Sequence, residues 1–250
     1  MRFPVPILIL FSGLPIFAAD DADAFDSPQG SEIVERYISA LAAQRENPRP
    51  VQMEMDIDAE LPRLKKTGRL HAFRFVPKVG RIVYDALRFE GDNTVKKEVI
   101  ARYLEAERSA RSDYAGSIAI SAENYKFKYK GEADYVGRTA HVFQVTPRKK
   151  RVGLFEGELW VDAKTYLPLR EWGEFVKNPS VFLRSVYFVR DYIIEDGVSL
   201  PRRIISDVDT RLVGRAKLTI WYNNPSVGSP SDAAVTANGA QLCVPTRFGN

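Results

Sequence analysis

Residues 125–175 read YKFKYKGEADYVGRTAHVFQVTPRKKRVGLFEGELWVDAKTYLPLREWGEF, and this stretch decides the fold. Apolar and polar side chains alternate along it, and short polar segments interrupt the alternation. Successive side chains of a β-strand point to opposite faces of its sheet, so this alternation is typical of half-buried strands. The stretch therefore predicts consecutive antiparallel strands joined by tight turns.

The same pattern extends in both directions from this stretch. Three strands are expected before it, at 51–59, 68–75 and 80–89. The strands expected in the second half of the chain are 117–121, 124–136, 138–147, 152–162, 167–177, 183–194, 200–208 and 214–222. Their connections are short, which favours pairing of each strand with the next one along the chain.

Two helices interrupt the strands. Ser31 is the expected N-cap of the first, which runs to about Ala43, and Asp92 is the expected N-cap of the second, which runs to about Ser109. Both carry apolar residues at helical spacing and so have one side to bury. The predicted fold is therefore mainly β, of the α+β class. It is a curved antiparallel sheet that forms an incomplete β-barrel, covered by an N-terminal helix and an inserted helix.

The N-terminus has the layout of a secretory signal peptide. Residues 1–19 carry a positive charge at Arg2, then an apolar run that ends near small residues. The run is shorter than the roughly 20 residues that a membrane-spanning helix needs. No cysteine follows it that could carry a lipid anchor. We therefore expect export to the periplasm as a soluble protein.

The remaining chain divides into three parts. Residues 20–30 are acidic and small and are expected to form a flexible leader. Residues 31–223 are expected to form one domain, and 224–250, rich in Asn, Pro, Ser, Gly and Ala, a disordered tail. The single cysteine, Cys243, lies in that tail, so no intramolecular disulfide holds the fold.

The charge balance excludes one class of partner. The chain has 36 basic and 32 acidic residues, and removing 1–19 takes away only Arg2, which leaves 35 − 32 = +3. A charge of this size, spread over the chain, does not indicate nucleic-acid binding. The densest basic cluster is residues 148–151. It is interpreted either as a solvated hairpin tip or as a transient contact with anionic lipid head groups or an acidic partner.

No pattern in the sequence indicates catalysis. The two histidines, His71 and His141, lie in separate predicted strands and have no nucleophile signature near them. Asp56 and Asp58 share one face of a strand, where carboxylates mostly point into water. Glycine loops that cradle phosphate and zinc-ligand spacings are absent from the sequence. We therefore expect a protein that is not an enzyme and that needs no cofactor or metal.

Aromatic residues are the distinctive feature of the predicted sheet. Many of them are expected to form the core against the two helices. The strand 183–194 looks apolar on both faces, so one face is expected to lie under the helices and the other to be covered by a further layer, a bound hydrophobic molecule or a partner. The predicted ligand-binding residues are the large side chains of central strands: Trp160, Trp172, Phe175, Phe188 and Trp221.

Two neighbouring motifs resemble those of a known family. The first is Asp134-Tyr135-Val136-Gly137-Arg138-Thr139-Ala140-His141-Val142-Phe143, continuing to Pro147. The second is Gly157-Glu158-Leu159-Trp160-Val161-Asp162-x-x-Thr165-x-Leu167-Pro168-Leu169-Arg170. Together they resemble the bacterial outer-membrane lipoprotein carrier and sorting superfamily (LolA-like proteins), which includes the periplasmic sensor that regulates the envelope-stress sigma factor.

That resemblance implies an open β-barrel with helices over its mouth and an apolar lumen for acyl chains in transit. The leading hypothesis is therefore a monomeric periplasmic carrier or sensor that binds a lipid or a lipoprotein acyl chain. The alternative hypothesis is a non-enzymatic interaction module of the envelope, such as a stress regulator or an assembly factor. In that case the apolar face, or an open sheet edge, would receive a protein partner.

Overall fold

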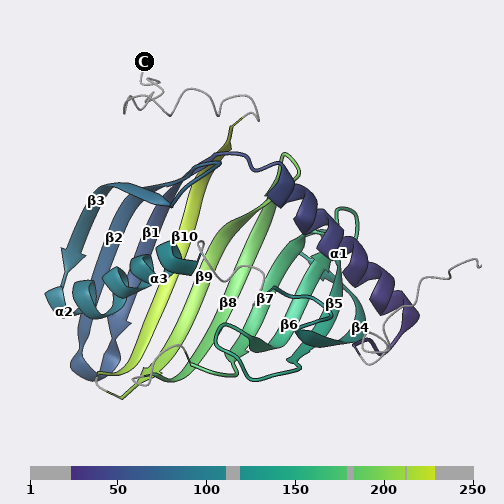
Figure 1. The fold of residues 1–250 in the computed structure, drawn as a ribbon. Coiled ribbons are helices and arrows are strands. Elements are labelled where there is room, and N and C mark those ends of the chain that lie inside the picture. Colours follow the sequence, from purple (N-terminus) through teal and green to yellow (C-terminus); the bar gives the residue numbers. More distant parts are fainter. Residues whose placement is uncertain (1–23, 111–118, 179–182, 212, 229–250) are drawn as a thin grey trace, which may run out of the picture.

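The computed structural model describes residues 24–110, 119–178, 183–211 and 213–228. Within these residues one antiparallel sheet has the strand order β3-β2-β1-β10-β9-β8-β7-β6-β5-β4 (Figure 1). The strands are β1 Val51–Leu61, β2 Lys66–Val76, β3 Val83–Gly91, β4 Tyr125–Tyr135, β5 Arg138–Pro147, β6 Phe155–Asp162, β7 Pro168–Phe175, β8 Leu183–Glu195, β9 Val198–Thr210 and β10 Gly214–Val227.

The sheet is a continuous antiparallel meander in two parts. Strands β1 to β3 pair in sequence order, as do β4 to β10, and the pairing of β1 with β10 joins the two parts. The edge strands β3 and β4 are not paired with each other, so the sheet stays open. The prediction of an incomplete antiparallel barrel with sequential neighbours is therefore confirmed.

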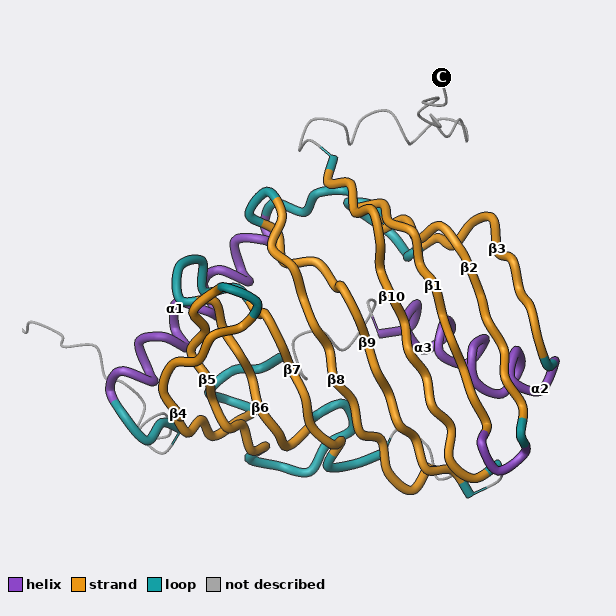
Figure 2. Tube along the Cα trace, turned by 180° about the vertical axis from the view of Figure 1, so that it is seen from behind, coloured by secondary structure: helices purple, strands orange, loops and turns teal. Residues whose placement is uncertain are grey.

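Both helical segments lie on the same face of the sheet. The first is α1 Pro28–Glu46; the second is continuous and consists of α2 Asn93–Val95, a π-helical turn η2 Lys96–Ala101 and α3 Arg102–Ala110. They stand before the sheet in Figure 1 and behind it in Figure 2. A short 3-10 turn, η1 Pro62–Leu64, links β1 and β2. We call the side of the sheet that the helices cover the helix face, and the opposite side the outer face.

Two hydrophobic clusters lie beneath these helices. One joins β1, β2, β9 and β10 to the inserted helical segment, and includes Met53, Met55, Ile57, Val95, Ile100 and Ile220. The other joins α1 to β4, β5, β6 and β8, and includes Val34, Tyr37, Tyr125, Phe143, Leu159 and Phe188. The alternation of the strand residues therefore supplies one buried face for two separate helices.

Several predicted boundaries are corrected at the N-terminal side. Helix α1 begins at Pro28, and its N-cap is Ser27, whose hydroxyl accepts a hydrogen bond from the Gly30 amide at 3.1 Å, so Ser31 lies inside the helix. Proline is favoured in the first turn of a helix because its missing N–H needs no partner there. The described part of the expected leader, residues 24–30, is held against the sheet, since the Phe127 amide donates to the Ala24 carbonyl at 2.6 Å.

Other predicted elements differ or lie outside the described residues. Residues 119–121 form a bend instead of the expected strand, and β10 extends to Val227, into the expected tail. Pairing with β1 provides the partners for this extension, because Val51 lies opposite Val227. Outside the described residues lie the predicted signal peptide, residues 20–23 of the leader, residues 117 and 118 of the expected strand, and residues 229–250 with Cys243.

The turn between β6 and β7 explains the second sequence motif. The carboxylate of Asp162, 2% exposed, accepts hydrogen bonds from the Thr165 amide at 2.9 Å and the Thr165 hydroxyl at 2.8 Å. Its other oxygen accepts from the Arg138 guanidinium at 2.9 Å. Burial alone would raise the pKa of Asp162, but the hydrogen bonds from Arg138 and Thr165 lower it below its ordinary value of 3.8.

We expect Asp162→Asn to lower the free energy of unfolding at pH 7 by about 2 kcal/mol, as is typical for hydrogen bonds to a charged group. Because the folded-state pKa of Asp162 is depressed, its contribution is present above pH 3.8 and is lost as the pH falls through the folded value. Urea unfolding at pH 7 and pH 3 should therefore show a difference between wild type and variant that shrinks at pH 3. The exposed Asp196→Asn is the control, and an equal difference at both pH values would contradict the role of the charge.

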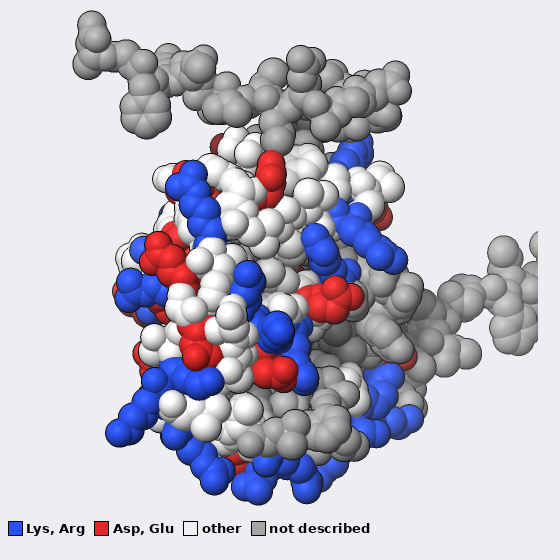
Figure 3. All heavy atoms as spheres, turned by 90° about the vertical axis from the view of Figure 1, so that its left-hand side faces the viewer, with Lys and Arg blue, Asp and Glu red and all other residues white. Residues whose placement is uncertain are grey.

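The surface at the β3 edge carries mixed charges. Figure 3 shows lysine, arginine and carboxylate side chains interspersed there, with basic side chains gathered toward its lower end. This mixture agrees with the nearly balanced composition of the whole chain. None of the helices in the described ranges is sufficiently long and apolar to cross a membrane.

Candidate functional site

The five predicted ligand-binding residues do not share one surface. Phe188 belongs to the buried cluster beneath α1, and Phe175 packs against the same cluster, with the two rings 5.2 Å apart. These two residues therefore lie on the helix face. The three tryptophans lie on the outer face, so the structure corrects the prediction that all five line one lumen.

Strand alternation fixes the position of the tryptophans. Leu159 and Val161 are buried beneath α1, so Trp160 between them points outward. The Trp172 indole lies beside it, since both indole N–H groups donate to the Glu158 carboxylate, at 2.9 and 3.0 Å. On β10, Ile220 and Tyr222 are buried, and Trp221 between them is 39% exposed on the outer face.

A paired charge network lies between these tryptophans on the outer face. Asp191, 3% exposed, accepts hydrogen bonds from Arg203 at 2.6 and 2.9 Å and from the Tyr135 hydroxyl at 2.7 Å. Arg170 lies 3.3 Å from the same carboxylate. Arg203 stacks over the Trp221 ring at 5.2 Å. The outer face thus presents aromatic rings together with the guanidinium groups of Arg170 and Arg203, whose charges are paired with Asp191.

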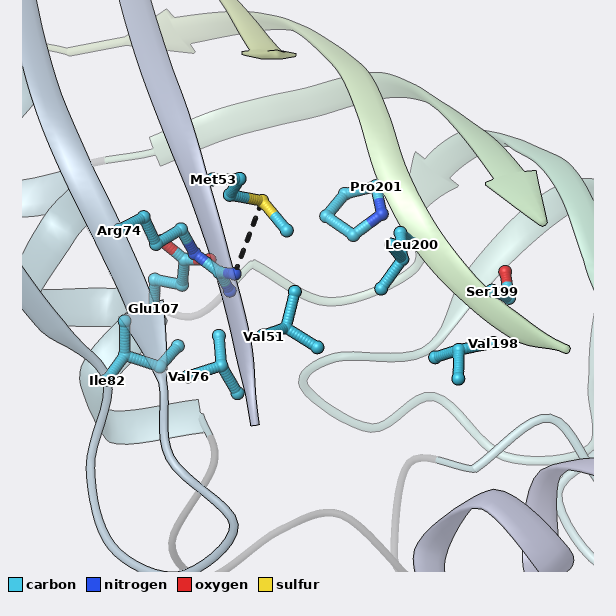
Figure 4. A pocket seen from close by; sticks show the side chains of 10 residues that line it. All are labelled: Val51, Met53, Arg74, Val76, Ile82, Glu107, Val198, Ser199, Leu200 and Pro201. Carbon is cyan, nitrogen blue, oxygen red and sulfur yellow. Dashed lines mark hydrogen bonds and ion pairs between the residues drawn. The ribbon is translucent and has the colours of Figure 1, made fainter. Parts of the chain in front are cut away.

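The helix face contains an open cavity of about 450 Å³. It lies where β1 and β9 begin and β2 ends, beside α3 (Figure 4). The residues that line it are Val51, Met53, Arg74, Val76, Ile82, Glu107, Val198, Ser199, Leu200 and Pro201. Seven of these ten are apolar, so the cavity presents a mainly apolar surface around one ion pair.

Arg74 and Glu107 are the charged residues in this cavity. Arg74 is 8% exposed, and its Nε and Nη2 atoms donate to one Glu107 oxygen at 3.1 and 2.7 Å. The second Glu107 oxygen accepts a short hydrogen bond from the Tyr84 hydroxyl. The third guanidinium nitrogen, Nη1, lies 3.8 Å from the Met53 sulfur (Figure 4). Glu107 on α3 is thereby tied to β2 and β3 through buried polar side chains.

Burial acts in opposite directions on the pKa of Arg74 and on the pKa values of the neighbouring tyrosines, Tyr84 and Tyr222. Burial would lower the pKa of Arg74, but the adjacent Glu107 charge raises it, so the guanidinium stays charged. Burial and the Glu107 charge raise the pKa of Tyr84, and burial raises the pKa of Tyr222 to about 12. Both tyrosines therefore remain neutral over the physiological pH range, and Tyr84 donates its hydroxyl proton to Glu107.

A second ion pair, with a buried carboxylate and a partly exposed guanidinium, lies on the helix face between the two hydrophobic clusters. Arg190 on β8 donates to Glu171 on β7 at 3.2 Å, and Glu171 is 7% exposed. Burial, then the Glu171 charge, raises the pKa of both Tyr192 on β8 and Tyr37 on α1. The centre of the helix face is therefore polar, and the apolar surface is divided into two parts.

Sequence analysis missed the charged residues of the cavity. Arg74 follows Leu70 and Ala72 on the buried side of β2, where alternation predicts an apolar residue. That exception was a local signal of a buried charge. Glu107 carried no comparable signal, because it lies 33 positions further along the chain, on the inserted helix, and reaches Arg74 only through the tertiary fold.

A protein-family model matches part of the chain. Residues 92–172 match the MucB/RseB N-terminal domain. The matched range begins at Asp92, the N-cap of the inserted helix, and includes β4, β5 and β6 and most of β7. No curated protein sequence matches the chain.

Three solved structures show how far the likeness extends. A DUF1329 family protein from Desulfovibrio piger is 12% identical over 80% of this chain and 94% of its own, with a TM-score of 0.44. A putative outer membrane lipoprotein-sorting protein domain from Vibrio parahaemolyticus is 14% identical over 80% of this chain and 92% of its own, with a TM-score of 0.40. A LolA superfamily protein from Nitrosomonas europaea is 13% identical over 80% of this chain and 94% of its own, with a TM-score of 0.35.

At TM-scores below 0.5 these structural likenesses identify no shared ligand or activity. The family match over residues 92–172 is the stronger finding. Its range includes the motifs at 134–147 and 157–170, and it confirms the resemblance to the envelope-stress sensor that these motifs predict.

Proposed function

We propose that this protein is an exported periplasmic carrier or sensor that binds a hydrophobic ligand, a lipid or a lipoprotein acyl chain, and that it is not an enzyme. The observation that carries the proposal is the apolar cavity of about 450 Å³ on the helix face. The signal-peptide pattern of residues 1–19 and the family match over residues 92–172 support the periplasmic address.

The energetics of the cavity favour a flexible apolar chain. Each buried methylene contributes roughly 0.8 kcal/mol, so ten carbons contribute roughly 8 kcal/mol before the costs of association. The walls formed by Val51, Met53, Val76, Val198 and Leu200 provide this burial without requiring polar contacts from the ligand. The open shape of the site would let the remainder of an amphiphile stay in solvent.

The first experiment is native mass spectrometry of the mature protein purified from an envelope extract. We expect a stoichiometric adduct that disappears on denaturation, and organic extraction followed by lipid identification then names the bound molecule. A bare protein mass, with no binding of added acyl lipids, would contradict the proposal.

A variant that fills the cavity tests its location. Val198→Trp places a large ring at a lining position at the start of β9. We expect it to reduce lipid occupancy at least tenfold while the thermal unfolding temperature changes little. Trp172→Phe, on the outer face, is the matched control and should retain the lipid. Equal occupancy in both variants would place the ligand elsewhere.

A second candidate function is supported by the outer face. Trp221 is 39% exposed and lies under the Arg203 guanidinium. Tyr187 is 41% exposed, and its ring lies beside that of Trp172. Exposed Trp, Tyr and Arg are enriched at protein interfaces. If the first experiment finds the protein without a bound lipid, the next step is crosslinking in envelope extracts. A partner protein that crosslinks to the wild type but not to the Trp221→Ala variant would favour an interaction module.

A further inference from the structure

We infer that the Arg74 guanidinium in the cavity receives an uncharged carbonyl oxygen, so the ligand is an acyl ester or amide and not a free fatty acid. This inference rests on the proposed function, because it names the ligand class of the same cavity. It follows from the hydrogen bonds that three side chains, Arg74, Glu107 and Tyr84, make with one another, and from the net charge of the group.

One guanidinium nitrogen is poorly satisfied. The Nε and Nη2 atoms of Arg74 both donate to Glu107, while Nη1 contacts the Met53 sulfur at 3.8 Å. A thioether is only a weak acceptor, and a buried donor without a good acceptor costs free energy. Both Arg74 and Met53 line the cavity, so an acceptor atom of a ligand placed there would meet Nη1 (Figure 4).

The other polar group in the cavity wall offers little to a ligand. The Ser199 hydroxyl donates to the Pro168 carbonyl at 3.0 Å. Among the lining residues within the described part of the chain, the remaining side chains besides Glu107 are apolar. The polar contact available to a ligand therefore centres on Arg74.

The charge balance then selects the kind of acceptor. Glu107 neutralises Arg74, and its second oxygen is already occupied by the Tyr84 hydroxyl. A ligand carboxylate at Nη1 would bring a second negative charge to a guanidinium that Glu107 already neutralises, in a partly desolvated site where repulsion between like charges is poorly screened. A neutral carbonyl supplies the missing acceptor without adding charge. An ester or amide is therefore favoured over a carboxylate.

The test uses three ligands with the same ten-carbon chain. They are 1-decanoylglycerol, which has the ester carbonyl; 1-decylglycerol, an ether that lacks it; and decanoate, which is charged. Isothermal titration of the mature protein at pH 7 should show the ester binding roughly 2- to 10-fold more tightly than the ether, as expected for one hydrogen bond. Decanoate should bind more weakly than the ester.

Variants assign these differences to the named side chains. Glu107→Gln keeps the acceptor for Arg74 but removes the negative charge, so we expect decanoate to bind at least as tightly as the ester. In Arg74→Met the ester and the ether should bind equally. Because that variant leaves Glu107 without its cation and could fail to fold, Arg74→Met combined with Glu107→Leu provides a second route to the same comparison.

The outcomes separate this inference from the proposed function. If none of the three ligands binds, the proposed function fails. If all bind the wild type with equal affinity, or if decanoate binds most tightly, the cavity still takes acyl chains but the role of Arg74 is overturned. A preference for the ester that persists in the double variant would also overturn it.

Discussion

Gly157→Ala is expected to destabilise the protein by about 3 kcal/mol or more, because it forces a methyl group into the backbone of the neighbouring strand. A Cβ atom at Gly157 would lie 1.9 Å from the Trp172 carbonyl oxygen and 2.6 Å from the Gly173 Cα. These are backbone atoms, which cannot rotate away as a side chain would. Urea unfolding followed by tryptophan fluorescence measures the loss.

The reason for the close approach lies in the pairing of β6 and β7. Gly157 and Gly173 are direct partners in this pair, and a Cβ at Gly173 would in turn lie 2.3 Å from the Glu156 carbonyl oxygen. Glycine inside a strand usually marks such a close approach of two backbones. Gly173→Ala should therefore cost as much as Gly157→Ala.

The neighbouring residue provides the control for this prediction. Glu156 lies on the same strand, and its side chain is exposed, so Glu156→Ala should change the free energy of unfolding by less than about 0.5 kcal/mol. If both glycine variants were as stable as this control, β6 and β7 could move apart without loss of folding free energy. The close approach of the two backbones would then not be needed for the fold.

Local alternation made the sheet predictable. In β1, Met53, Met55 and Ile57 alternate with polar residues, and the structure buries all three on the helix face. The short turns fixed which strands are neighbours, because a tight turn leaves the next strand no other position. The pairing of β1 with β10 had no such signal, since the two strands are far apart in the chain and no turn joins them.

The same alternation could have predicted on which face of the sheet Trp160 and Trp172 lie. Trp160 shares its side of β6 with Glu156 and Glu158, and both of these glutamates are on the solvent side. Trp172 likewise lies on the same side as Arg170 and Glu174. Size and hydrophobicity suggested a lumen, but the period of two assigns these residues to the face of their charged neighbours.

The cavity shows where prediction from sequence stops. Arg74 is unusual within its own strand, which indicates a buried charge but not its partner. Glu107 follows it by 33 positions and lies on the helix α3, whereas Arg74 lies on the strand β2. Their meeting depends on how the inserted helix crosses the sheet, which is decided by the packing of residues such as Val95 and Ile100 and not by any local pattern.

Breaking this pair is the second large effect that we expect. Arg74→Met should lower the free energy of unfolding by roughly 3 kcal/mol, because it leaves the partly buried Glu107 carboxylate without its cation. Combining it with Glu107→Leu should recover most of this loss, since replacing both partners of a buried ion pair by apolar residues is often neutral. Urea unfolding of the two variants and the wild type measures both steps.

An exposed pair on the same helical segment provides the matched control. Arg102 and Glu98 form an ion pair with side chains 62% and 38% exposed, so Arg102→Met should cost less than about 1 kcal/mol. A similar loss for Arg74→Met would mean that water reaches Glu107 freely. Failure of the double variant to recover stability would mean that Tyr84, left without its acceptor, needs Glu107 more than Arg74 does. The expected pattern, a large single loss and a small double one, would establish that Arg74 and Glu107 stabilise the fold as a pair while lining the proposed ligand cavity.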